Sequence, residues 1–144
     1  MLVFASDHRG YKLKQELVNY FRNENIECVD VGTDSEESTD FPIYAKLGAK
    51  KVLEDTHNIG VFICHSGNGM VMAGNRFKGI RASLCTEKHW AMLARRDDLA
   101  NVIVIPSGIV NTEDAKELIK EFLNTPYGDG KYKRRADMID DPNY

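Results

Sequence analysis

Cys64 carries the clearest indication of chemistry in this sequence, because it ends a short apolar run and stands directly before a glycine-rich turn. The turn, 65–69, reads His-Ser-Gly-Asn-Gly, and its two glycines let the backbone approach a ligand closely. A helical pattern follows over 70–75, so free N–H groups and the positive end of the helix dipole predict an anion site at the turn. A partly exposed cysteine at a helix start is favoured in its reactive thiolate form. We therefore expect a reactive thiol beside an anion site.

Other polar residues also follow the ends of predicted strands. Asp7 and His8 follow the first apolar run, and further loops lie at 85–86 and 106–108. Parallel strands bring their carboxyl ends to one edge of a sheet, so Asp7, His8, Cys64 and Ser66 are expected to converge. Two simpler interpretations stay open. Asp7 and His8 can form a helix cap with a surface histidine, and Cys64 can be a buried, inert thiol.

The remaining cysteines and histidines give no second site. We expect Cys28 and Cys85 in the core, and His57 and His89 at the surface. No two histidines have the spacing of metal ligands, so no metal site is expected. The three cysteines are an odd number and none is in CxxC spacing, which predicts free thiols and a cytoplasmic location.

Three other chemistries do not fit the motif. A cysteine phosphatase needs Cys-x5-Arg, but the residue six positions after Cys64 is Met70. A cysteine protease needs an oriented histidine and a third group, and the sequence nominates neither. A dinucleotide site needs GxGxxG after the first strand, which residues 7–10 (Asp-His-Arg-Gly) do not supply. No cofactor is expected.

Alternating apolar runs and helical patterns position these residues. Strands are predicted at 1–6, 26–31, 61–63, 80–84 and 101–105, with a polar loop at 33–40 and Pro42 in the first turn of a helix. Thr86 and Asn111 are predicted helix caps. The predicted buried faces of the four larger helices are Leu13, Leu17, Tyr20 and Phe21; Ala45, Ala49, Val52 and Leu53; Trp90, Leu93 and Ala94; and Leu118, Ile119, Phe122 and Leu123. Five strand–helix units predict an α/β fold, a parallel sheet with helices on both faces.

The C-terminal segment is basic and has few apolar residues of its own. Lys131, Arg134 and Arg135 share one helix face, where they can clamp a phosphate or simply form a solvated basic face. A short terminal helix after Gly128-Asp-Gly130 is expected to pack on a neighbouring subunit, so we expect a homo-oligomer.

Length and composition set the outer limits. The 144 residues are expected to form one domain, 1–144, and the net charge of −3 argues against nucleic acid and anionic membranes as partners. No apolar run approaches the roughly 20 residues that span a bilayer.

Taken together, the motifs resemble the ribose-5-phosphate isomerase B family, which also contains the galactose-6-phosphate isomerase subunits. The resemblance covers almost the whole chain. The matching stretches are Ser6-Asp-His-x-Gly10, Asp40-Phe-Pro-x-Tyr44, Ile63-Cys-x-Ser-Gly-x-Gly-Met70, Asn75-Arg-x-x-Gly-Ile-Arg81, Ala100-Asn-Val-Ile103 and Asp129-Gly-Lys-Tyr-Lys-Arg-Arg135.

The resemblance implies a Rossmann-like three-layer α/β/α sandwich with five parallel strands, in a homodimer or homotetramer whose active sites lie between subunits. It implies aldose–ketose isomerisation of a sugar phosphate through a cis-enediolate, without cofactor or metal. Cys64 matches the catalytic base. The other implied site residues are Ser66 with the amides of Gly67, Asn68 and Gly69 for the enediolate oxygen, Asp7 for sugar hydroxyls and ring opening, His8, Lys131 and Arg135 for the phosphate, and Tyr44 at the substrate.

Several positions depart from the family pattern. The family's Arg-x-His-Asn stretch is Arg95-Arg-Asp-Asp98 here, so Asp97 replaces the ring-opening histidine and Asp98 the asparagine. A carboxylate can still transfer a proton, although its ordinary pKa of about 4 suits neutral pH less well. Gly108 replaces a phosphate-binding arginine, and Lys131 replaces another. His65 stands where glycine is usual, and as a neighbour of Cys64 it is a second candidate for ring opening.

Two functions of different class stay open. The first is an active isomerase, with ribose 5-phosphate as the expected substrate and a hexose 6-phosphate (allose or galactose) as the runner-up. The second is a catalytically weak sugar-phosphate-binding partner subunit. A third reading, a redox-sensing thiol protein, needs a resolving cysteine near Cys64.

Overall fold

Five parallel strands form one sheet at the centre of the computed structural model, which describes residues 1–144. Their order across the sheet is β2-β1-β3-β5-β4. The strands are β1 (Leu2–Ser6), β2 (Cys28–Asp30), β3 (Ile59–Cys64), β4 (Ala82–Leu84) and β5 (Val102–Pro106). All five predicted strands are present, and the α/β sandwich is confirmed. None of the helices has both the length and the apolar character that crossing a membrane requires.

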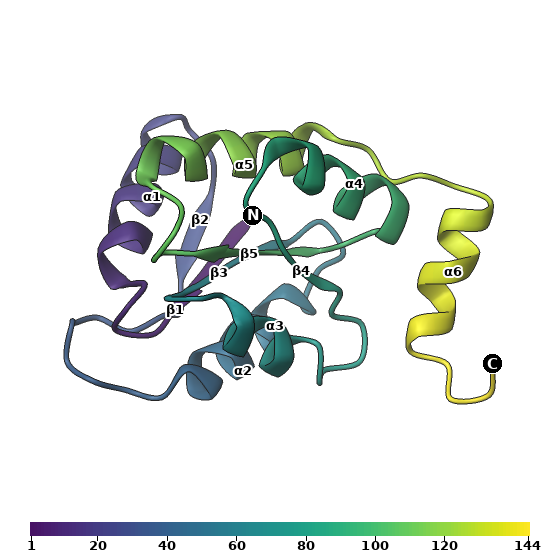
Figure 1. Cartoon of the computed structure of the whole chain (residues 1–144), viewed down its shortest axis with the longest axis horizontal. Coiled ribbons are helices and arrows are strands. Elements are labelled where there is room, and N and C mark those ends of the chain that lie inside the picture. The colour runs from purple at the N-terminus through teal and green to yellow at the C-terminus, as the bar shows by residue number, and fades with distance from the viewer.

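Helices cover both faces of this sheet (Figure 1). On one face lie α1 (Tyr11–Asn23), α4 (Lys88–Asp98) and α5 (Thr112–Asn124), and on the other lie α2 (Phe41–Val52) and α3 (Asn68–Gly74). The strands alternate between the two cores with period two, as strand geometry requires. In β3, Val61 and Ile63 join the core under α1 and α5, whereas Phe62 and Cys64 join the core under α2 and α3.

The strand order places a topological switch point between β1 and β3. The helix after β1 packs on one face of the sheet and the helix after β3 packs on the other. The two loops therefore diverge and leave a crevice at the carboxyl ends of these strands, where open parallel sheets bind ligands.

Two predicted helix faces need correction. Trp90 is 56% exposed and Leu53 is 46% exposed. On α4 the buried residues are Ala91 and Ala94, small side chains that let the helix pack closely. Leu53 follows the last residue of α2 as its C-cap and therefore leaves the buried face.

The two predicted caps have different outcomes. Glu87, not Thr86, is the N-cap of α4. The predicted cap of α5 is confirmed, because the Asn111 side chain accepts a hydrogen bond of 2.8 Å from the Asp114 amide.

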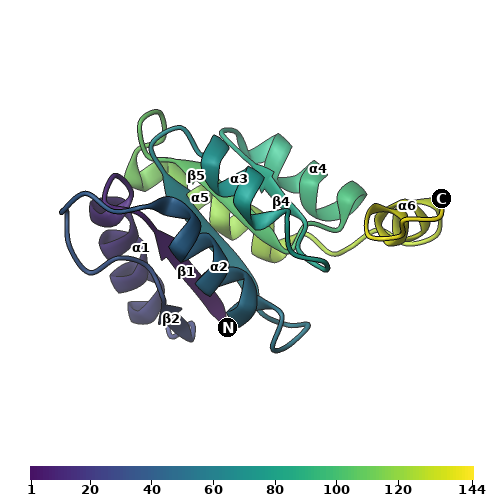
Figure 2. The same ribbon diagram turned by 90° about the horizontal axis from the view of Figure 1, so that it is seen from below.

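The last helix, α6 (Lys131–Ile139), projects from the side of the molecule beyond α4 (Figures 1 and 2). Ala136 is its one buried residue, as the polar sequence predicts. The carboxylate of Asp140, just after the helix, accepts a hydrogen bond of 2.8 Å from the Gly79 amide and ties the helix end to the body.

Candidate active site

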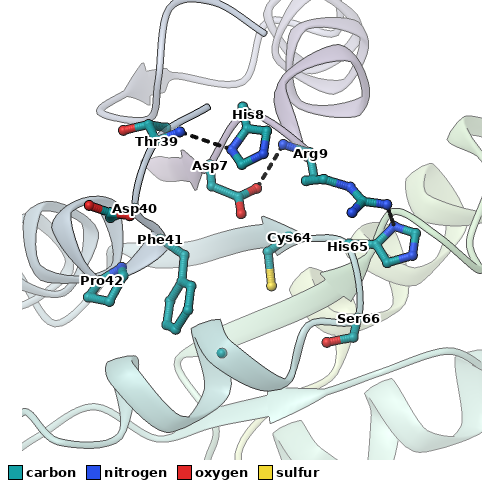
Figure 3. A pocket seen from close by; sticks show the side chains of 11 residues that line it. Asp7, His8, Arg9, Thr39, Asp40, Phe41, Pro42, Cys64, His65 and Ser66 are labelled. Carbon is teal, nitrogen blue, oxygen red and sulfur yellow. Dashed lines mark hydrogen bonds between the residues drawn. The ribbon is translucent and has the colours of Figure 1, made fainter. Parts of the chain in front are cut away.

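A cavity of about 640 Å³ opens at the switch point between β1 and β3 (Figure 3). Its walls come from the loop after β1, the turn after β3 and the segment that enters α2. The lining residues are Asp7, His8, Arg9, Thr39, Asp40, Phe41, Pro42, Cys64, His65, Ser66 and Gly69. The predicted convergence of Asp7, His8, Cys64 and Ser66 is therefore present in the fold.

Cys64 lies at the inner end of this cavity. Its sulfur points into the space between Phe41 and Ser66 (Figure 3). The residue is only 5% exposed, so the predicted partial exposure is wrong: the thiol faces the cavity but is otherwise enclosed. The Cys64 carbonyl accepts a hydrogen bond of 2.9 Å from the Ser107 amide, which holds the strand end in place.

The glycine-rich turn places hydrogen-bond donors beside the thiol. Gly67 caps α3 with φ +79°, a conformation that favours glycine. The Ser66 hydroxyl oxygen accepts a hydrogen bond of 3.2 Å from the Asn68 amide, so its hydrogen is free to point to a ligand. A Cβ on Gly69 would lie 2.8 Å from the Phe41 ring, so only glycine lets this ring close the cavity wall.

Asp7 has both roles that the sequence analysis considered, one at the start of a helix and one in the site. Its Oδ1 accepts hydrogen bonds from the amides of Arg9 (3.0 Å) and Gly10 (3.2 Å), which shape the turn into α1. Its Oδ2 makes no hydrogen bond within the chain and is available to a ligand.

His8 is not the free surface histidine of the simpler interpretation. Its Nδ1 accepts a hydrogen bond of 3.2 Å from the Thr39 amide. The acceptor role makes Nδ1 unprotonated, so the neutral ring carries its hydrogen on Nε2. Tyr44 lies behind this contact, with its hydroxyl 3.1 Å from Thr39 Oγ1, and does not line the cavity.

Two positions that depart from the family pattern are in contact. The His65 ring lies directly over Gly108, where a Cβ would be only 2.5 Å from the ring. Nδ1 of the same ring lies 3.1 Å from Nη2 of Arg9. A side chain at position 108 would therefore displace the His65 ring from its present position.

Four predicted site residues do not reach the cavity within one chain. Asp97 and Asp98 end α4, which runs back across the sheet to the amino end of β5. The five residues of β5 alone span about 16 Å. Lys131 and Arg135 lie on the projecting helix α6. Gly67 and Asn68 adjoin the cavity without lining it.

The two carboxyl groups at the end of α4 have different electrostatic environments. Arg96 forms a 2.6 Å ion pair with Asp97, and this hydrogen bond lowers the pKa of the Asp97 carboxyl. Burial, with the Asp97 charge as a smaller cause, raises the pKa of Asp98. Of the two, Asp98 has the pKa closer to neutral.

The other cysteines lie away from Cys64. Cys85 is buried in the core under α1 and α5, on the opposite face of the sheet from Cys64. Burial raises its pKa to about 11. Cys28 is half-buried on β2. The prediction that both belong to the core is confirmed for Cys85 and needs correction for Cys28, which is only partly buried against the edge of that core. Neither thiol is placed to resolve an oxidised Cys64.

Sequence reasoning missed the part of the site that comes from other loops. Arg9, Thr39, Asp40, Phe41 and Pro42 line the cavity but were not predicted as site residues. The signal for the last three was present in the Asp40-Phe-Pro-x-Tyr44 stretch, of which only Tyr44 was assigned to the substrate.

Comparisons with known proteins agree with this geometry. Residues 2–139 match the Ribose/Galactose Isomerase family. Ribose-5-phosphate isomerase B of Escherichia coli K12 is 36% identical over 138 residues, which cover 96% of this chain and 93% of the relative.

Two solved structures are similar over 96% of this chain. A ribose 5-phosphate isomerase from Thermotoga maritima superposes with a TM-score of 0.94 at 40% identity, covering 96% of that chain. Ribose-5-phosphate isomerase B from Mycoplasma genitalium, solved with bound ribulose-5-phosphate, superposes with a TM-score of 0.91 at 33% identity, covering 92% of that chain. The match in sequence, fold and extent confirms the resemblance, and this chain belongs to the ribose/galactose isomerase family of enzymes.

Proposed function

We propose that this protein interconverts ribose 5-phosphate and ribulose 5-phosphate. The observation that carries the proposal is the Cys64 sulfur, which points into a polar cavity at the carboxyl ends of β1 and β3. The similar structure with bound ribulose-5-phosphate supports the same class of substrate. No cofactor is required by the proposed chemistry, because the reaction only moves protons and one carbonyl group within the sugar.

Cys64 is the proposed base. As a thiolate it removes the proton from C2 of the open-chain aldose, and the C–H electron pair forms the C1–C2 double bond of a cis-enediolate while the carbonyl electrons move to O1. The thiol then returns the proton to C1, and the proton of the C2 hydroxyl passes to O1, which leaves a ketone at C2. General acid–base catalysis of this kind contributes about 10²–10⁴-fold to the rate.

The turn after β3 is proposed to stabilise the enediolate oxygen. The Ser66 hydroxyl has a free hydrogen because its oxygen already accepts from the Asn68 amide. Together with the amides of Gly67, Asn68 and Gly69, it forms an oxyanion hole in this proposal. Hydrogen-bond donors fixed before the reaction stabilise the developing charge without reorganisation.

Asp7 is proposed to bind sugar hydroxyls through Oδ2, the oxygen left free by the turn. His8 contributes its Nε2 hydrogen to the phosphate. Tyr44 supports this wall through Thr39. We assign the proton transfers of ring opening to Asp97 and the binding of substrate beside it to Asp98. Because its pKa is raised and that of Asp97 is lowered, Asp98 is the better proton donor of the two at neutral pH.

These assignments require a second copy of the chain. Asp97, Asp98, Lys131 and Arg135 lie away from the cavity of their own chain, while α6 projects with an almost unburied surface. We therefore propose a homodimer or homotetramer in which α6 and the end of α4 complete the cavity of a neighbouring subunit.

Two alternatives remain as proposals. The family description names galactose as well as ribose, which favours a hexose 6-phosphate (galactose or allose) as the second substrate candidate. A weakly catalytic, sugar-phosphate-binding partner subunit is the other, because the family's ring-opening histidine is Asp97 here.

The test is to supply purified protein separately with ribose 5-phosphate, allose 6-phosphate and galactose 6-phosphate and to measure the ketose formed. We expect the highest kcat/KM with ribose 5-phosphate. A higher value with either hexose phosphate would change the substrate assignment. Binding of the sugar phosphates without turnover of any would support the partner-subunit alternative.

A further inference from the structure

Arg9 and His65 form a pair at the rim of the cavity that the proposed mechanism does not use. The two residues come from different loops, after β1 and after β3, and both side chains are exposed. Nη2 of Arg9 lies 3.1 Å from Nδ1 of His65, and both residues line the same cavity as Cys64.

The charge of this pair follows from its geometry. Arginine has only N–H donors and stays protonated, so Nδ1 of His65 must accept the hydrogen bond. The His65 ring is then neutral with its hydrogen on Nε2. The pair therefore carries one positive charge and offers only donors to its surroundings: the other guanidinium N–H groups and the His65 Nε2–H.

The backbone around the pair is built to hold it. Gly108 leaves the space that the His65 ring fills, and its amide donates a hydrogen bond of 2.9 Å to the His65 carbonyl. The neighbouring Ser107 hydroxyl donates a hydrogen bond of 2.9 Å to the Arg9 carbonyl. The loop after β5 thus holds both members in place at the rim of the cavity.

We infer that Arg9 and His65 together bind the phosphate group of the substrate. The inference rests on the proposed function for the substrate class, and it identifies residues of this chain that set affinity for the anion. A guanidinium fork with a neighbouring N–H donor matches the several acceptor oxygens of a phosphate. In this role His65 is a hydrogen-bond donor through Nε2 and not the acid–base group for ring opening, because its Nδ1 is occupied by the hydrogen bond from Arg9.

The decisive variants are Arg9→Met and His65→Ala, with His65→Asn as the conservative variant that keeps a neutral donor. Arg22→Met is the matched control, since Arg22 lies at the far end of α1 and its side chain donates a hydrogen bond to the Cys28 carbonyl, outside the cavity. Titration calorimetry with inorganic phosphate measures the anion site without any turnover. Steady-state kinetics with ribose 5-phosphate then separates KM from kcat.

We expect Arg9→Met to weaken phosphate binding and raise KM by about tenfold to a hundredfold, with kcat changed less than about threefold. His65→Ala is expected to have a smaller effect of the same kind, and His65→Asn to recover part of it. Gly108→Ala, which displaces the ring, is expected to act like His65→Ala. Arg22→Met is expected to leave phosphate binding and both kinetic constants unchanged.

The outcomes separate this inference from the proposed function. If the wild type isomerises no sugar phosphate but binds phosphate, and Arg9→Met loses that binding, the anion site is upheld and the isomerase is refuted. An active isomerase whose Arg9→Met variant keeps its phosphate affinity and KM would overturn the inference, as would wild-type protein that binds no phosphate. A fall in kcat for His65→Ala with unchanged phosphate binding would overturn the role of His65 and return it to ring opening.

Discussion

The amide of Thr39 donates a hydrogen bond of 3.2 Å to Nδ1 of His8, and this contact joins the loop after β2 to the loop after β1. The long loop therefore forms a wall of the cavity instead of extending into solvent. The contact also fixes the neutral His8 ring with its hydrogen on Nε2. The hydrogen bond between Thr39 and His8 thus sets both the position of the loop after β2 and the ring nitrogen that His8 offers as a donor.

Lys14 is expected to hold the base of that loop. Its ammonium is buried and donates to the Asp30 carboxylate at 2.6 Å and to the Thr33 carbonyl at 2.7 Å. Lys14→Met leaves both acceptors unpaired, and we expect it to lower the free energy of unfolding by about 2–4 kcal/mol. Urea unfolding measures the change. Lys12→Met, at an exposed position of the same helix α1, is the control with an expected effect under about 0.5 kcal/mol, and equal midpoints for the two variants would refute the role of Lys14.

The conformation of Gly67 gives a second prediction. Gly67 has φ +79°, and a Cβ there would overlap the Leu84 side chain, whereas Gly130 has φ +57° with open space around its Cβ position. Gly130→Ala therefore introduces backbone strain alone, of about 1–3 kcal/mol. Gly67→Ala introduces backbone strain and also an overlap of the new Cβ with Leu84 Cδ1 in the buried turn, so its thermal midpoint is expected to lie below that of Gly130→Ala. The reverse order of midpoints would contradict the turn geometry.

Asp97 and Asp98 are expected to affect stability with opposite signs. The raised pKa of Asp98 means that the folded state holds this proton more tightly than the unfolded state does, so stability is lost as pH rises through the two values. Asp98→Asn is therefore expected to raise the thermal midpoint at pH 7 slightly, by no more than about two degrees.

The lowered pKa of Asp97 stabilises the fold above the ordinary aspartate pKa, and this contribution is lost in acid. Asp97→Asn should thus lower the midpoint at pH 7, and this effect should shrink as pH falls below the ordinary aspartate pKa of about 4. Thermal unfolding of both variants between pH 3 and 7 gives the test, and a fall in the midpoint of Asp98→Asn at pH 7 would refute the sign assigned to that group.

A shared active site predicts complementation between two inactive variants. Cys64→Ala removes the base in one chain, and Arg135→Ala removes a phosphate contact that is proposed to act on the neighbouring chain. When equal amounts of the two variants are mixed, unfolded together and refolded, half of the dimers contain one chain of each variant. Each mixed dimer has one intact site of its two, so about a quarter of the wild-type number of sites should be regained. Each variant refolded alone is the control. Mixtures no more active than the controls would place both residues in the same chain's site.

Much of the fold could be predicted because it depends on local patterns. The apolar runs of β1, β3 and β5 are buried on both faces and could be recognised from sequence alone. The face of α4 could not, because the large Trp90 dominated its apolar pattern. In the structure the helix packs through Ala91 and Ala94 instead, and the Arg95 guanidinium stacks on Tyr127, 4.1 Å from the ring centroid.

The parts of the site that could be predicted lie in short continuous motifs of the sequence. Cys64 and Ser66 stand in a single glycine-rich turn, and Asp7 and His8 follow a strand end at the same edge. The pairing of Arg9 with His65 depends on two loops 56 positions apart and on the space over Gly108. Such a contact between loops has no periodic signal in the sequence.

The central claim, that Cys64 is the base of an aldose–ketose isomerase, is tested most directly by kcat/KM for ribose 5-phosphate in the wild type, Cys64→Ala and Cys28→Ala. Cys28→Ala is the matched control, since it removes a half-buried thiol on β2, outside the cavity. We predict a fall of about 10²–10⁴-fold for Cys64→Ala and a value within about twofold of wild type for Cys28→Ala. A Cys64→Ala variant that keeps the wild-type kcat/KM would contradict the account.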